Sequence, residues 1–160
     1  MKKIEFPLVE RLAIRYGILM TLALIGFFML MTAFGLEHHL ELRAFNIFIL
    51  FSFVLMAVKA YRRRRNYRTP YFSGLGVGVL TTIIGTVLFA MFVLLYLTVI
   101  SPEFMAQIKS QEPFGDFLTP LLVVLTIIIE GTASGILVSY ALMQYFRPDH
   151  LVTSSEIFNN

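Results

Sequence analysis

The sequence predicts an all-α fold, an integral membrane bundle of four transmembrane helices with both termini on the cytoplasmic side. Hydrophobic residues make up 58% of the 160 residues, and the mean hydropathy is +0.78. That is too apolar for a water-soluble domain of this length. Four apolar segments are each long enough to cross a hydrocarbon layer about 30 Å thick. Because no separate polar domain is visible, we expect one membrane domain over residues 1–160.

The four spans are expected near residues 12–36, 44–61, 73–100 and 118–146. Each must be a helix, because backbone polar groups in lipid have to be satisfied within the segment. The first span is too long for a signal peptide, whose apolar region is about 7–15 residues, and we interpret it as a retained helix.

Two segments outside the spans carry weaker signals: the loop before the fourth span and the C-terminal tail. In the outer loop 101–117, Ser101-Pro102-Glu103 is typical of a helix start, so we expect a short helix in the membrane interface there. Residues 148–160 form a polar tail.

The distribution of Lys and Arg predicts the orientation. With the N-terminus inside, 11 of the 13 Lys and Arg residues lie on the inner side, and only Arg43 and Lys109 lie outside. This satisfies the positive-inside rule. The stretch YRRRRNYR is a short loop between two spans, so we expect Arg62, Arg63, Arg64 and Arg65 to contact anionic lipid headgroups and not nucleic acid.

Small and polar residues mark two helix faces inside the membrane. At about 100° per residue, the third span gathers small side chains on one sector. These are Gly74, Gly78, Thr81, Thr82 and Gly85. The fourth span carries Gly131 and Gly135 on one sector, with Glu130 and Ser134 on the next. Since small residues let helix backbones approach closely in lipid, we expect these two spans to pack together along their glycines.

Glu130 is the unusual residue of the fourth span. An ionised acid at the centre of a transmembrane helix costs about 2.5–3.5 kcal/mol. We therefore expect Glu130 to be neutral, to face protein and not lipid, and to donate a hydrogen bond to a carbonyl or to Thr81 or Thr82. The alternative is that Glu130 handles protons or cations on a transport path, which is a common role of intramembrane acids.

No cofactor, metal site or catalytic group is expected. The chain has no cysteine, which excludes disulfides, thiol catalysis and Cys-ligated metal centres. His38 and His39 are adjacent and point about 100° apart on a helix, so we interpret them as part of a solvated turn and not as metal ligands. No nucleophile with a base and an orienting acid falls on one helix face, so we expect no enzymatic activity.

Four motifs carry a resemblance to a known family. They are VKAYRR, YFSGLGVGVLTT, ISPEFMAQIKSQ and EGTASGILVSYALMQYF. Over most of residues 11–147 the chain resembles an uncharacterised family of small four-span inner-membrane proteins found mainly in Bacteroidota. The resemblance implies a helical protein of the bacterial inner membrane and brings no catalytic residue, cofactor or substrate.

These observations together favour a non-catalytic accessory or scaffolding subunit. We expect it to contact anionic lipids on the cytoplasmic side and to pack against other integral membrane subunits or form a homo-oligomer. The alternative is a small oligomeric transporter or proton- or cation-conducting protein that uses Glu130.

Overall fold

The computed structural model describes residues 5–34, 45–66, 70–111 and 115–146, and every element in these ranges is a helix. The four long helices are α1 (Glu5–Ala33), α3 (Phe45–Arg64), α4 (Tyr71–Leu95) and α6 (Pro120–Tyr145). A π-helical turn over Tyr96–Ile100 extends α4, α5 covers Pro102–Gln111, and a 3-10 turn covers Gly115–Phe117. Four helices are long and apolar enough to cross a membrane, at Leu8–Ala33, Phe45–Arg64, Tyr71–Ile100 and Pro120–Tyr145. The prediction of four helical spans is therefore confirmed.

Local sequence signals explain where α6 begins and where α3 ends. Thr119 caps α6: its hydroxyl accepts a hydrogen bond from the backbone N–H of Leu122 at 3.3 Å, and Pro120 fills the first turn, where no backbone donor is needed. After Arg64 the chain turns through Asn66, whose φ of 49° is left-handed. Asparagine tolerates that conformation better than most residues, so it can end α3.

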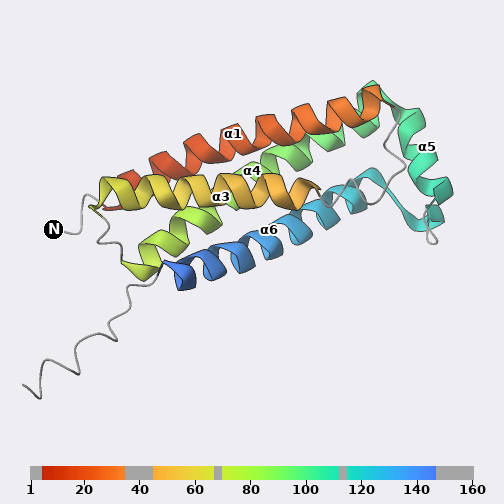
Figure 1. The fold of residues 1–160 in the computed structure, drawn as a ribbon. Helices are drawn as coiled ribbons and strands as arrows, with labels where there is room; N and C mark the ends of the chain where they lie inside the picture. The colour runs from red at the N-terminus through yellow and green to blue at the C-terminus, as the bar shows by residue number, and fades with distance from the viewer. Residues whose placement is uncertain (1–4, 35–44, 67–69, 112–114, 147–160) are drawn as a thin grey trace, which may run out of the picture.

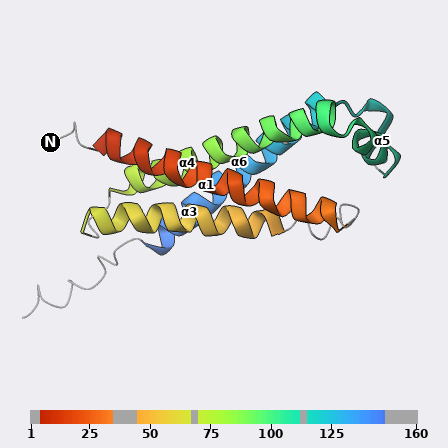
Figure 2. The same cartoon turned by 90° about the horizontal axis from the view of Figure 1, so that it is seen from above.

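The four long helices run up and down alternately, and α4 lies at the centre. It packs against α1, α3 and α6, with its most extensive contacts to α1 and α6 (Figure 1). The start of α1, the end of α3, the start of α4 and the end of α6 all lie at one end of the bundle. The view from above shows α1 and α4 crossing one another (Figure 2). Because three helices share α4, its surface decides how the bundle is assembled.

At the other end of the bundle, α5 closes over an aromatic cluster. Phe28 of α1 lies edge-on to Tyr96 and to Phe104 of α5, with ring centroids 5.0 and 6.1 Å apart. Met105 of α5 is also buried. The helix expected in the outer loop is thus present as α5, and it is tied to α1 and to the end of α4 by ring contacts.

Two features interpreted from the sequence lie outside the described residues. They are the turn that contains His38 and His39, and the polar tail over residues 148–160.

Candidate functional site: two glycine seams and an exposed acid

The first seam joins α4 to α6. A Cβ atom added at Gly135 would overlap Thr82, and one added at Gly131 would lie 2.5 Å from the Cγ2 atom of Thr86. Further along, the backbone of Gly78 on α4 lies directly against Ser139 on α6. The expected approach of these two spans along Gly131 and Gly135 is present, because glycine on one helix meets a threonine or serine on the other.

The second seam joins α4 to α1. A Cβ atom at Gly17 of α1 would lie 2.9 Å from Cγ2 of Ile84 and 3.2 Å from the backbone oxygen of Thr81. Gly85 faces Met20 of α1. The small face of α4 is therefore shared between two neighbours: the part around Thr82 and Gly78 meets α6, and the part around Gly85 meets α1.

This sharing corrects the expectation that the whole small face of the third span would take α6. Gly74 and Gly78 are buried in the first half of α4, as expected for a packing face. Thr81 is buried as well, but its backbone oxygen lies against α1. The reason is geometric: a sector about 100° wide on a central helix is broad enough to contact two partners that approach from different directions.

The hydroxyl groups of the seams are satisfied mostly within their own helices. Thr81 donates to the carbonyl of Val77 at 2.7 Å, Thr82 to that of Gly78 at 3.0 Å, and Ser139 to that of Gly135 at 2.6 Å. This back-bonding to the residue four positions earlier is usual for hydroxyls in apolar helices.

One hydroxyl also bonds across a seam. Thr21 donates to the carbonyl of Gly17 at 2.9 Å and lies 3.2 Å from the carbonyl of Gly85 on α4. Because Gly85 has no side chain, its carbonyl is accessible to α1, so this bond and the close approach depend on the same glycine.

Glu130 does not lie in either seam. Its side chain is exposed on the outer surface of α6, and it makes no hydrogen bond or ion pair with another residue of the described ranges. The prediction that it faces protein within the chain and bonds Thr81 or Thr82 is therefore wrong. Five residues separate Glu130 from Gly135, which turns it about 140° around the helix from the centre of the seam. Ser134 is half-buried at the margin of the seam.

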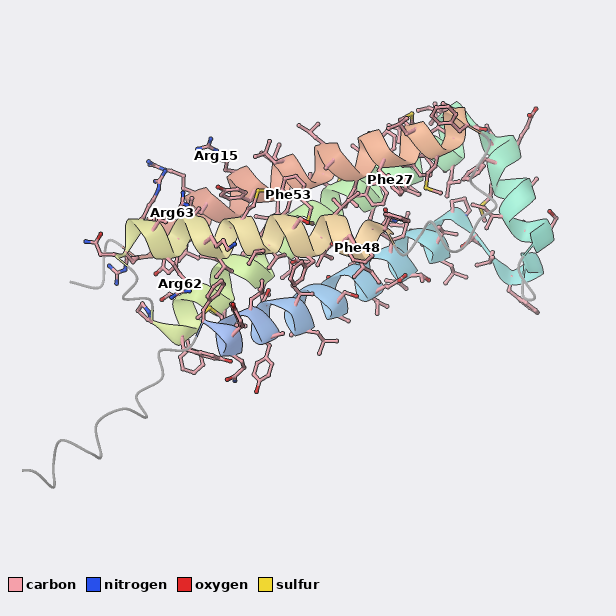
Figure 3. All side chains as sticks on the ribbon, viewed as in Figure 1. Arg15, Phe27, Phe48, Phe53, Arg62 and Arg63 are labelled. Atoms are coloured by element: carbon pink, nitrogen blue, oxygen red, sulfur yellow. The ribbon has the colours of Figure 1, made fainter. Side chains whose placement is uncertain are left out.

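The basic residues of α1 and α3 gather at the end of the bundle where α1 begins. Figure 3 shows Arg15, Arg62 and Arg63 there. Arg63 and Arg64 are exposed, as headgroup contacts require. Arg62 differs, because its guanidinium lies 4.2 Å from the centre of the Phe146 ring and so links α3 to the end of α6 by a cation–π contact.

Several structural contributors were not singled out from the sequence, among them Gly17 of the α1–α4 seam. Thr86 and Ser139 complete the α4–α6 seam, and each lies four residues after a residue that was recognised, Thr82 and Gly135 respectively. Extending the search by one helical turn would have found both. Phe28 gave no such signal, because it is one of 16 phenylalanines in the chain.

The fold and these seams define a class: an all-helical protein with four helices able to span a membrane, held together by close glycine contacts. Residues 15–147 match the model of the family described as "Protein of unknown function (DUF4199)". Since the match covers most of the chain, the protein belongs to that family. No curated protein and no solved structure matches the chain.

Proposed function

We propose that this protein is a non-catalytic accessory or scaffolding subunit that packs its helices against transmembrane helices outside its own bundle. The proposal places it in the bacterial inner membrane with both termini in the cytoplasm. The concentration of Lys and Arg at one end of the bundle supports that orientation.

The observation that carries the proposal is the exposure of Glu130. A carboxyl group near the middle of a transmembrane helix is costly in lipid, and such groups normally face protein or a water-filled cavity. Within the described part of the chain, no neighbouring helix covers Glu130. A helix outside the bundle would remove this cost, and this is the role of a subunit that assembles with others.

The surface of α6 supports the same proposal. Only 11% of the most apolar window of α6 is buried within the structure, compared with 39% for the window of α4. The uncovered surface is not uniformly apolar, because Thr126 and Ala133 are exposed on it together with Glu130. Polar and small residues are typical of helix–helix contacts in membranes.

The position of Glu130 also limits the alternative, a transport function that uses this residue. Because Glu130 lies outside the four-helix bundle, a path that used it would run between chains and not through one chain.

The test is to solubilise the protein from its own membrane in a mild detergent and measure its mass by size exclusion with light scattering. We expect an assembly larger than one chain of 18.3 kDa. Glu130→Gln, which keeps a hydrogen-bonding group, should preserve the assembly, and Glu130→Leu should reduce it. A monomer at all concentrations would overturn the proposal, as would a proton or cation flux in vesicles that Glu130→Gln abolishes.

A further inference from the structure

The strongest unexplained feature of the molecule is the outer face of α6 around Glu130. A sector of about 80° on the surface of α6 contains five residues, and we call this sector the Glu130 face. They are Thr126, Glu130, Ala133, Leu137 and Ala141, and all five are exposed. The exposed face of α1 is a useful comparison, because it presents bulky apolar residues such as Ile18, Leu22 and Leu30, as a lipid-facing surface should.

The Glu130 carboxyl has no hydrogen-bond partner among the described residues of its own chain. The hydroxyl of Thr126, one turn earlier on the same helix, already donates to the carbonyl of Leu122 at 2.9 Å. A neutral carboxyl needs both an acceptor for its O–H and a donor for its C=O. Hydrocarbon offers neither, and no described residue of the chain bonds the carboxyl, so another polypeptide is a source that can supply both.

We propose that the partner of the Glu130 face is a second copy of this chain, with the two Glu130 carboxyls hydrogen-bonded to each other across a two-fold axis. The inference rests on the proposed packing function and names the occupant of that surface. A neutral carboxylic acid is self-complementary, because each group donates one hydrogen bond and accepts one. No basic residue is required on the other helix.

Depth in the membrane favours a second copy over an unrelated helix. Two copies insert with the same orientation, so their Glu130 residues lie at the same depth. A two-fold axis along the membrane normal then brings identical residues face to face, as isologous contacts require. An unrelated helix would need a polar group placed independently at that depth.

The shape of the face also suits a close pair of helices. Ala133 and Ala141 stand two turns apart, with the larger Leu137 between them, and Leu137 is 70% exposed. Small residues let the two backbones approach, and a leucine of each copy can then pack beside the alanines of the other. The position of α6 at one edge of the bundle leaves this approach open (Figure 1).

Cysteine cross-linking in native membranes tests the proposal, and the absence of natural cysteines makes it direct. Two versions of the full chain with different epitope tags are expressed together, each carrying Ala133→Cys, and are oxidised in the membrane. We expect a cross-linked product of twice 18.3 kDa that contains both tags. The matched control is Leu22→Cys, at a site on α1 that is 60% exposed, and it should give little product.

Substitutions of the acid in the Ala133→Cys background complete the test. Glu130→Gln should retain the product, because an amide both donates and accepts, whereas Glu130→Leu should reduce it about tenfold, as expected for the loss of a hydrogen bond in lipid. Equal product from Ala133→Cys and Leu22→Cys, or no effect of Glu130→Leu, overturns the pairing.

The outcomes also separate this inference from the proposed function. Cross-linking of Ala133→Cys only to proteins of another mass, dependent on Glu130, overturns the second copy but leaves the packing function standing. Absence of any cross-link, with the protein recovered as a monomer, overturns both.

Discussion

Gly135→Ala is the sharpest test of the seam between α4 and α6. A methyl group at this position would overlap the Cβ, Cγ2 and Oγ1 atoms of Thr82. Thr82 is 1% exposed and its hydroxyl is bonded to the carbonyl of Gly78, so its side chain has no free direction in which to turn. The clash can be relieved only if the two helices move apart.

The expected magnitude follows from two opposing contributions. Overpacking of this kind costs about 2–3 kcal/mol, and replacing glycine by alanine inside a helix returns about 1 kcal/mol. The net loss of stability is about 1–2 kcal/mol, which corresponds to a fall of about 2–8 °C in the unfolding midpoint for a chain of this size. The assay is the temperature at which half of the detergent-solubilised protein still elutes as a single peak.

Two further variants decide whether the seam is the cause. Gly26→Ala is the matched control, since nothing lies within 4 Å of a Cβ atom at Gly26, and it should leave the midpoint unchanged or raise it. In the background of Thr82→Gly, which removes the overlapping atoms, Gly135→Ala should no longer destabilise. An equal loss from Gly135→Ala in both backgrounds would refute the seam as the source of the effect.

Three other predictions use the same chain. Gly17→Ala should lower the stability by about 1–2 kcal/mol and so lower the midpoint temperature in the same elution assay, because the new methyl would meet Ile84 and a backbone oxygen; an unchanged midpoint would contradict a tight α1–α4 seam. Phe28→Ala should cost about 1–3 kcal/mol, less than for a fully buried ring because Phe28 is half-buried, and should loosen α5, which limited proteolysis would detect as faster cleavage near α5; unchanged cleavage would contradict the role of this ring. A cysteine at Ala106 should react with an impermeant maleimide added to intact cells, and one at Arg64 only after permeabilisation; the reverse pattern would rule out the proposed orientation.

The number and approximate positions of the spanning helices could be predicted from the sequence because they depend on length and composition. Their limits were less accurate: the first span was expected over 12–36, and α1 is observed over Glu5–Ala33. The second helix was expected over 44–61 and is observed over Phe45–Arg64, three residues longer at its basic end. A helix can continue into an arginine run when the side chains reach the membrane surface, and hydropathy does not register this. Boundaries set by capping, such as Thr119-Pro120, were closer to the prediction.

Which helix each small face meets could be predicted only in part. The glycines of the fourth span were expected to meet the third, and Gly135 does lie against Thr82. The position of Glu130 was misjudged because the fourth span carries small or polar residues on two different sectors. Periodicity identifies both sectors as packing faces, but only the three-dimensional arrangement shows that α4 covers one of them and leaves the other exposed.

The π-helical turn at the end of α4 has a consequence for insertions and deletions. Its defining bond runs from the backbone N–H of Ser101 to the carbonyl of Tyr96 at 2.9 Å, five residues back, so the turn holds one residue more than ordinary helical pitch would allow. Removing a single residue here would restore that pitch and rotate the segment that follows, beginning with α5, by about 100° about the axis of α4. Phe104 would then lose its contact with Phe28. The direction in which α5 leaves α4 therefore depends on the number of residues in this one turn.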